Sequence, residues 1–205
     1  MFARVAALQG LLLLAYPALM YFALGFVSPR VLGLCTLALI AARMAIFART
    51  RLVALARLFA PVGLAFAATS LLSLIWNDEL WLRLAPALVN LALFAVFALS
   101  LARRETAIET IARAQVGELS AEEVTYCRRV TVVWSAFLAA NSAACAAVAL
   151  LGSREAWALY TGVVAYVLLG VVFASEYVYR HWRFRRYVGA PTDVLLRRLF
   201  PPRPS

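Results

Sequence analysis

The sequence predicts an all-α, polytopic membrane protein with about six transmembrane helices and short extracytoplasmic loops. The first observation is composition: of 205 residues, 65% are hydrophobic and 15% are charged, and the mean hydropathy is +0.85. Soluble domains are about half apolar and about a quarter charged, so this chain has too little polar surface to cover a water-soluble core. The second observation is that the apolar residues form runs near the ~20 residues that cross a bilayer.

Six apolar runs approach this length, and polar or helix-breaking residues separate them. The first run is about twice as long as the usual ~7–15-residue core of a cleaved signal, so we expect it to stay as a membrane anchor. We see no internal repeat and no low-complexity linker between the runs. The predicted spans are residues 5–27, 31–48, 58–76, 83–101, 130–151 and 156–177.

The distribution of arginine predicts the orientation. All 20 basic residues are arginine, and the net charge is +10. With six spans, 17 arginines fall on one side of the membrane, and only Arg30, Arg83 and Arg154 fall on the other. Basic residues favour the cytoplasmic side, so we expect a bacterial inner-membrane protein with both termini in the cytoplasm.

The C-terminal segment is the first candidate functional region. We divide the chain into a transmembrane domain, residues 1–179, and a basic amphipathic cytoplasmic tail, residues 180–205. Arginines and aromatic residues alternate where the tail begins, which suits an anionic head-group region. A membrane anchor and a docking site for an acidic soluble protein both fit this pattern. The predicted contacts, for a partner or for lipid head groups, are Arg180, Trp182, Arg183, Phe184, Arg185 and Arg186.

The cytoplasmic connector, residues 102–129, is predicted to contain a short amphipathic helix on the membrane surface. A capping box at Thr106 begins this helix and Gly117 ends it. A second capping box at Ser120 begins the helix that continues into the fifth span. The segment fits either a docking element of mixed charge or a solvated connector.

Few polar side chains lie within the predicted spans, and no ionisable residue lies near the midplane, so ion-coupled transport and embedded acid–base catalysis lack their usual residues. Asn90 and Asn141 lie deep, and we expect an interhelical hydrogen bond worth roughly 0.5–2 kcal/mol, with a ligand pocket as the alternative. Glu176 lies toward a cytoplasmic helix end, where we expect it to pair with Arg43 or Arg57. A substrate or proton role for Glu176 is the alternative.

Small residues recur at every fourth position of the fifth span. They give this helix a smooth face that allows another helix to approach closely. The face fits either packing within one chain or the seam of a homodimer. Its members are Ser135, Ala139, Ala143 and Ala147.

Patterns for catalysis and metal binding are weak. The single histidine is His181, and none of the common zinc, dinucleotide, P-loop or nucleophile motifs occurs. The three cysteines form no C-x-x-C pair and are predicted to be packing residues. Asp78 and Glu79 lie between two tryptophans; a solvated acidic turn in an aromatic belt is favoured over a divalent-cation site. We therefore predict no enzymatic activity, no cofactor, no metal and no nucleic-acid partner.

Scattered motifs resemble two bacterial families. The first set is Trp76-Asn77-Asp78-Glu79, Trp134-x-x-Phe137-x-x-x-Asn141, Trp157 and Glu176-Tyr177-x-Tyr179-Arg180-His181. This set resembles the intracellular septation protein A family of inner-membrane proteins over about half of the chain. That resemblance implies a part in envelope synthesis and division, through contacts with other membrane proteins.

A second set of motifs extends over most of the chain. It comprises Tyr16-Pro17, Ser28-Pro29, Pro86-x-x-x-Asn90, Arg128-Arg129-Val130-Thr131-x-x-Trp134, Gly152-Ser153-x-x-x-Trp157-Ala158-Leu159-Tyr160-x-Gly162 and Glu176-Tyr177. It resembles an uncharacterised bacterial inner-membrane family encoded beside fatty-acid-like synthases that make aryl-polyene pigments. Neither family supplies catalytic residues, and a ketosynthase would need a reactive cysteine with several histidines.

These observations predict a non-enzymatic inner-membrane accessory or scaffold protein for cell-envelope or acyl-product assembly of the aryl-polyene type. It would recruit an acidic carrier protein, or envelope and division membrane proteins, through Arg183, Arg185 and Arg186. The alternative is a small carrier or flippase for a lipid or acyl intermediate, with the deep amides and Glu176 lining its path. An enzyme acting on lipid-linked substrates through the acidic turn ranks last.

Overall fold

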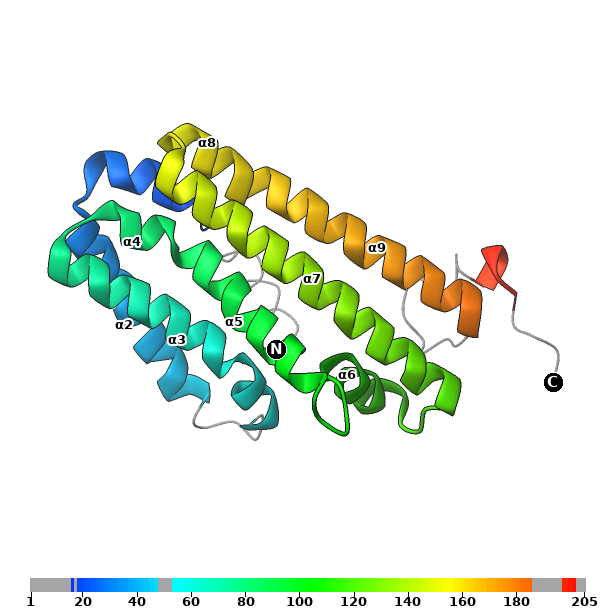
Figure 1. Cartoon of the computed structure of the whole chain (residues 1–205). Helices are drawn as coiled ribbons and strands as arrows, with labels where there is room; N and C mark the ends of the chain where they lie inside the picture. The colour runs from blue at the N-terminus through cyan, green and yellow to red at the C-terminus, as the bar shows by residue number, and fades with distance from the viewer. Residues whose placement is uncertain (1–15, 17, 48–52, 186–196, 202–205) are drawn as a thin grey trace. The chain divides into compact units, whose positions relative to one another are not determined.

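Helices make up almost all of the described chain, and no β-strand occurs in it (Figure 1). A computed structural model describes residues 16, 18–47, 53–185 and 197–201. Residues 18–26 are helical and precede α2. The helices that follow are α2 (Pro29–Phe47), α3 (Val53–Trp76), α4 (Glu79–Arg83), α5 (Ala85–Ser100), α6 (Ala107–Val116), α7 (Ala121–Leu151), α8 (Arg154–Leu159), the π-helix η1 (Tyr160–Val164) and α9 (Ala165–Phe184). The predicted all-α class is thereby confirmed for these residues.

The chain forms two compact units. Unit 1 comprises Met1–Val96 and Ala136–Tyr166, and unit 2 comprises Phe97–Ser135 and Val167–Ser205. Helices α5, α7 and α9 each contribute a segment to both units.

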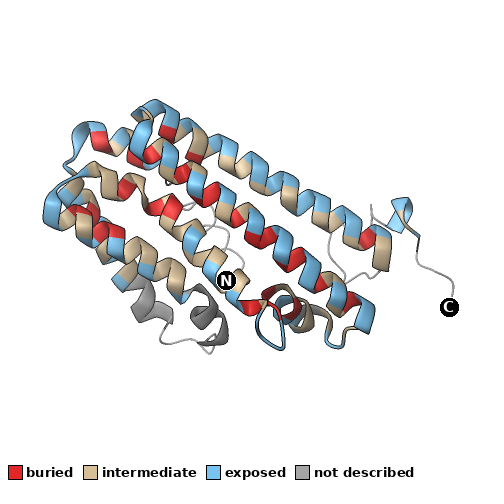
Figure 2. Cartoon of the chain, in the orientation of Figure 1, coloured by how far each residue is buried: buried red, intermediate tan, exposed pale blue. Residues whose placement is uncertain are grey.

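Two stretches of helix are long and apolar enough to cross a membrane. They are α7 and the run from α8 through α9, Arg154–Phe184, each of 31 residues. Shorter apolar helices cover Pro29–Ala41, Ala60–Trp76 and Ala85–Ser100. In α7, 39% of the most apolar stretch is buried in the protein, but in Arg154–Phe184 the share is 6% (Figure 2). Most of the apolar surface of that last helix therefore lies outside the protein interior.

Local start and stop signals work as the sequence predicts in the connector. The Thr106 hydroxyl accepts the N–H of Glu109 at 3.4 Å, and α6 ends at Gly117, whose φ of 76° favours glycine. At the start of α7 the capping box is complete: the Glu123 N–H donates to Ser120 Oγ at 3.3 Å, and the Ser120 N–H donates to Glu123 Oε2 at 2.8 Å. Both predicted helix starts are confirmed.

The core of unit 1 forms around one tryptophan. Trp157 is fully buried, and it clusters with Leu82, Ala149 and two residues of the 18–26 helix, Met20 and Leu24. A buried side chain of this size contributes about 3–5 kcal/mol relative to alanine. The cluster therefore joins the first helical segment to α4, α7 and α8 within this unit.

Helices α2 and α3 pack closely in unit 1 (Figure 1). A Cβ atom at Gly33 would lie 2.6 Å from the Ser70 carbonyl oxygen, so a larger residue would force the helices apart. Nearby, the Ser73 hydroxyl donates to the carbonyl oxygen of Pro29 at 3.0 Å. Small and hydroxyl-bearing residues thus allow a close approach of the kind common between helices in membranes.

In unit 2 the first half of α7 and the second half of α9 run antiparallel. The ring centroids of Trp134 and Phe173 lie 4.6 Å apart, and those of Tyr126 and Tyr179 lie 5.7 Å apart. As residue numbers fall along α7 they rise along α9, which requires opposite helix directions. Trp134 is 7% exposed and also contacts Phe97 of α5, with ring centroids 6.5 Å apart.

Candidate functional site

A chain of hydrogen-bonded polar side chains runs across three helices of unit 1. The Tyr160 hydroxyl of η1 donates to Asn141 Oδ1 of α7 at 2.9 Å. Asn141 Nδ2 donates to Asn90 Oδ1 of α5 at 3.0 Å, and Asn90 Nδ2 donates to the Pro86 carbonyl oxygen at 2.8 Å. The deep amides form an interhelical hydrogen bond as expected; the sequence did not indicate that they bond to each other or that Tyr160 is a third member.

Hydroxyl groups and a π-helical turn surround this chain. The Ser142 hydroxyl donates to the Ala87 carbonyl oxygen at 2.9 Å, and the Thr161 hydroxyl donates to the Trp157 carbonyl oxygen at 2.7 Å. Single π-helical turns inside longer helices are frequent at functional sites. Amide and hydroxyl side chains both donate and accept hydrogen bonds, so this group can orient or bind a polar group.

The acidic turn before α4 is fully engaged within unit 1. Asp78 caps α4 by accepting the Leu80 N–H at 2.8 Å. Glu79 forms an ion pair with Arg154, and its Oε1 lies 3.7 Å from Arg83 Nη1. Over the described part of the chain, no three His, Cys, Asp or Glu side chains gather as a metal site would require. The turn therefore resembles a structural junction more than a cation site.

Arg83 ties this turn to the end of α7. One of its Nη atoms donates to the carbonyl oxygens of Val148 at 3.1 Å and Gly152 at 2.8 Å. The Arg83 carbonyl oxygen in turn accepts the indole N–H of Trp157 at 2.8 Å. Cations interact favourably with the last carbonyls of a helix, and the Arg83 side chain is only 12% exposed.

Arg30 plays the same part at the end of α3. Its Nε donates to the Leu74 carbonyl oxygen at 2.9 Å, and its Nη2 donates to that of Ile75 at 3.3 Å. Its backbone N–H also donates to the side chain of Asn77 at 3.1 Å. Together with Arg83 and Arg154, all three arginines predicted to lie outside the cytoplasm have partners within unit 1.

Glu176 pairs within unit 2. Its Oε1 accepts the Tyr126 hydroxyl at 3.4 Å and lies 3.4 Å from Arg180 Nε, one helical turn away. The Glu176 side chain is 18% exposed. The predicted pairing with Arg43 or Arg57 stays a prediction, because those two side chains lie outside the described residues.

The end of α9 carries most of the predicted contact residues. Arg183 forms an ion pair with Glu122 at the start of α7, and the Phe184 ring packs against Tyr126 with centroids 5.1 Å apart. The sequence division placed the tail from residue 180, but α9 continues without a break to Phe184. Arg186 lies outside the described residues, as do the next ten residues of the predicted tail, and residues 197–199 are helical.

Arg185 ends α9 with an unusual backbone conformation. Its φ of 53° lies in the left-handed region, which glycine usually occupies after a helix. Its Nε donates to the Trp182 carbonyl oxygen and its Nη1 to that of Pro201, both at 2.9 Å. The guanidinium also lies over the Phe200 ring, 5.4 Å from its centroid.

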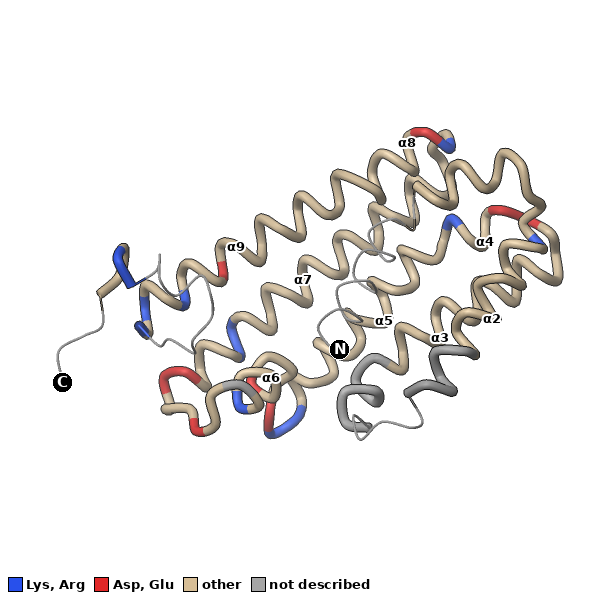
Figure 3. The backbone as a smooth tube through the Cα atoms, turned by 180° about the vertical axis from the view of Figure 1, so that it is seen from behind, with Lys and Arg blue, Asp and Glu red and all other residues tan. Residues whose placement is uncertain are grey.

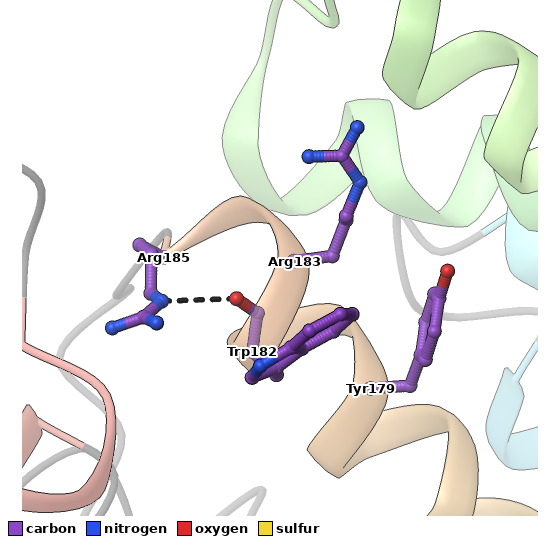
Figure 4. Close-up of a pocket in the computed structure, with 4 residues that line it drawn as sticks. All are labelled: Tyr179, Trp182, Arg183 and Arg185. Atoms are coloured by element: carbon purple, nitrogen blue, oxygen red, sulfur yellow. Dashed lines mark hydrogen bonds between the residues drawn. The ribbon is translucent and has the colours of Figure 1, made fainter.

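These residues border a surface hollow of about 260 Å³, shown in Figure 4. Tyr179 and Trp182 form an aromatic side, with ring centroids 5.6 Å apart, and each is about half exposed. Arg183 and Arg185 supply the cationic side. The hollow can accept a small anion that also has apolar surface.

A second group of arginines lies where α5 ends and α7 begins. Arg128 Nη2 donates to the Leu101 carbonyl oxygen at 2.8 Å, which brings α7 to the turn after α5. Arg103 and Arg104 in that turn are exposed, as are Arg128 and Arg129. Figure 3 shows basic and acidic positions side by side around α6. We call Arg103, Arg104, Arg128 and Arg129 the arginine cluster.

Acidic residues on α6 and just before it offset part of the positive charge of unit 2. Arg113 is hydrogen-bonded to Glu109 at 2.7 Å, and its Nε lies 3.9 Å from Glu105. The hydrogen bond to Glu109 raises the pKa of Arg113, and the negative charges of Glu109 and Glu105 raise it further. Glu109 is 3% exposed, so this ion pair holds α6 and is poorly placed to meet a partner.

The small-residue face of α7 is not uniformly covered. Ser135 is buried and donates to the Thr131 carbonyl oxygen at 2.8 Å, whereas Ala143 and Ala147 are exposed. The exposed part is compatible with a dimer seam, which stays a prediction.

Sequence reasoning missed several residues that the structure brings into these networks. Tyr160, Tyr126 and Glu122 each pair with a residue on another helix, and Trp157 was noted only for a resemblance. These pairs are 19 to 74 residues apart, beyond the reach of helix periodicity. The only local signal was the concentration of tyrosine and tryptophan near predicted helix ends, where aromatic residues gather in membrane proteins.

Comparison of the chain with known protein families, with curated proteins and with solved structures gave no match. The resemblances to the septation protein A family and to the family encoded beside pigment synthases therefore stay predictions.

Proposed function

We propose that the chain is a multi-pass inner-membrane protein with six spans and cytoplasmic termini. The main support is the poor burial of its last apolar helix, in which 6% of the most apolar stretch is covered by protein. Exposing apolar surface to water costs about 25 cal/mol per Å², so this helix is suited to lipid. Helices α2, α3 and α5 and the first apolar run would supply further spans.

The arginine partners support the proposed orientation. Arg30 and Arg83 bond to carbonyl oxygens at helix ends, and Arg154 pairs with Glu79. These bonds explain why three arginines occur on the side of the membrane that basic residues otherwise avoid. Alkaline phosphatase fused at the turn near residue 78 or residue 153 should be active, and a fluorescent protein fused after Ser205 should fold. An inactive phosphatase at residue 153, together with a dark C-terminal fusion, would contradict the six-span topology.

Within this topology, the proposed role is that of an accessory or scaffold protein without enzymatic activity of its own. It would recruit an acidic partner for cell-envelope or acyl-product assembly, as the resemblances imply. The observation that carries the docking role is the arginine cluster, in which Arg103, Arg104 and Arg129 are exposed. A patch of exposed positive charges accelerates the encounter with an acidic protein.

The bonds already made at the end of α9 support placing the proposed protein contact at the arginine cluster. Arg183 is already paired with Glu122, and Arg185 is bonded to two carbonyl oxygens. A carboxylate of a protein partner would compete with Glu122 for Arg183 and would meet only the remaining donors of Arg185. The exposed arginines of the cluster carry no such cost.

Co-purification of the full-length protein in mild detergent tests the docking role. The variant Arg103→Ala/Arg104→Ala/Arg129→Ala should lose the enriched protein partner, whereas Arg183→Ala/Arg185→Ala, the control, should keep it. If only the Arg183→Ala/Arg185→Ala variant lost the protein partner, the contact would lie at the end of α9. If both variants kept the partner at wild-type levels, arginine-mediated docking would be wrong.

The Asn90–Asn141–Tyr160 chain favours a second candidate, a carrier or flippase for a lipid or acyl intermediate. Such a polar path between helices could hold the polar end of a substrate. The double variant Asn90→Leu/Asn141→Leu separates the two roles. Transport predicts lost flux in a protein that still folds, whereas a packing role predicts lower stability with flux falling only as folded protein is lost.

A further inference from the structure

The hollow at the end of α9 combines three features that recognise one kind of ligand. Two guanidinium groups border it, and a guanidinium presents donors in a fork that matches a phosphate. Two half-exposed aromatic rings form its other side. The hollow has a volume of about 260 Å³, several times the ~30 Å³ that one water molecule occupies in the liquid. It therefore has room for a phosphate group.

The cationic side is held in place by the protein. Arg185 is fixed by its bonds to the Trp182 and Pro201 carbonyl oxygens, which together use two of the five N–H donors of a guanidinium. Arg183 is oriented by Glu122, whose side chain is 58% exposed. Of the described residues that line the hollow, two are arginines and none is acidic, so its lining is positively charged even though Glu122 pairs with Arg183.

The backbone conformation of Arg185 is a second observation, separate from the hollow, that favours a ligand site here. Its φ of 53° is a conformation that glycine adopts without steric cost and arginine does not. Side chains held in such positions cluster at sites of ligand contact. Figure 4 shows the Arg185 side chain beside Trp182, with its Nε bonded to the Trp182 carbonyl oxygen.

The apolar surface of α9 identifies the source of the phosphate. Val171, Phe173 and Val178 precede the hollow on the same helix and are 47–57% exposed. A phosphate carried by a lipid would place its acyl chains along this surface, whereas a free phosphate would leave it uncovered. Tryptophan and tyrosine also prefer the head-group level of a membrane.

We propose that the hollow lined by Tyr179, Trp182, Arg183 and Arg185 binds the phosphodiester of an anionic phospholipid. This inference rests on the proposed function only in that α9 spans the membrane with this end at the cytoplasmic head groups. It names a lipid site that is separate from the arginine cluster.

Native mass spectrometry of the full-length protein, released from nanodiscs of equal phosphatidylglycerol and phosphatidylcholine, measures the site directly. The wild type should retain phosphatidylglycerol over phosphatidylcholine, and Arg183→Ala/Arg185→Ala should lower that preference about tenfold, because each arginine near an anionic lipid contributes severalfold. The Arg103→Ala/Arg104→Ala/Arg129→Ala variant is the matched control and should keep the preference.

Arg185→Gly guards against loss of folding, because glycine suits the backbone at this position. It should lower the preference for phosphatidylglycerol while its unfolding temperature stays at or near that of the wild type. Brominated phosphatidylglycerol should also quench the fluorescence of Trp182, as the difference between the wild type and Trp182→Phe reports.

Three results would overturn the inference. One is an unchanged preference in Arg183→Ala/Arg185→Ala, and another is loss of bound lipid on adding millimolar inorganic phosphate, which indicates a soluble ligand. The third is a protein partner that leaves with Arg183→Ala/Arg185→Ala while lipid retention is unchanged, which makes the hollow a protein-docking site. Failure to recover the chain in membranes would instead defeat the proposed function, so the two failures are distinguishable.

Discussion

Units 1 and 2 use the same residue type in different ways. In unit 1, Arg30 and Arg83 donate to carbonyl oxygens at helix ends and Arg154 pairs with Glu79, so the described arginines act as internal braces. In unit 2, the arginine cluster is largely exposed, and the arginines at the end of α9 border an open hollow. The difference teaches that counting arginines locates charge but does not say whether the charge is structural or available to a partner.

The largest expected contrast is between two tryptophans. Trp157→Ala should lower the free energy of unfolding of the protein in detergent by about 3–5 kcal/mol, because it empties a fully buried site and removes the bond to Arg83. Trp182→Ala, at a half-exposed position in unit 2, should change it by less than about 0.5 kcal/mol. Denaturant titration followed by circular dichroism measures both. Equal losses in the two variants would erase the distinction between the units.

The next contrast concerns arginine itself. Arg83→Ala should cost about 3 kcal/mol, since it removes the cation from two helix-end carbonyls and leaves Glu79 with Arg154 as its remaining arginine partner. Arg103→Ala should cost less than about 0.5 kcal/mol, because its side chain is exposed. Arg83→Lys should recover only part of the loss, since one ammonium group lacks the fork of guanidinium donors. A small effect of Arg83→Ala by the same titration would mean that the brace contributes little.

A smaller effect is expected within the polar chain of unit 1. Asn141→Leu should lower stability by about 1 kcal/mol, because it removes both the bond from Tyr160 and the bond to Asn90. Tyr160→Phe removes one of those bonds and should cost about half as much. Ala140→Leu, at an exposed position on the same helix, is the control for added bulk. A loss in Ala140→Leu as large as that in Asn141→Leu would assign the effect to bulk.

The smallest effect compares two helix ends in unit 2. Gly117→Ala should destabilise the protein by about 1 kcal/mol, because alanine is strained at a φ of 76° even though the space around it is open. Arg185→Gly should change stability by less than about 0.5 kcal/mol, since backbone relief offsets the loss of a cation at a helix C-terminus. Thermal unfolding of both variants in one detergent checks the signs. A clear loss in Arg185→Gly would show that its bonds outweigh the backbone strain.

Features set by neighbouring residues were predictable. The helix starts at Thr106 and Ser120 and the stop at Gly117 depend on side chains within one turn of the site, and they appear where the sequence indicates. An interhelical hydrogen bond at Asn90 and Asn141 was also predictable, because an amide in an apolar helix needs a hydrogen-bonding partner; that the two amides bond to each other was not.

Features set by contacts between distant residues were not predictable from the sequence. Tyr126 reaches Glu176 from 50 residues away, and no periodicity in either helix indicates that pairing. The end of α9 at Phe184 was also missed, because hydropathy falls where charged residues begin, although arginine is compatible with helix. The short helix α4 depends on the cap at Asp78, which the sequence reading treated only as an acidic turn.

The brace at Arg83 also has a consequence for how the chain is made. Synthesis proceeds from the N-terminus, and Arg83 emerges 65 to 69 residues before the carbonyl groups of Val148 and Gly152 that it bonds. Trp157, which fills the core beside it, emerges later still. A nascent chain that has reached only the end of α5 therefore lacks both the partners of Arg83 and the side chain that fills the core, and both are supplied together once α7 and α8 have been made.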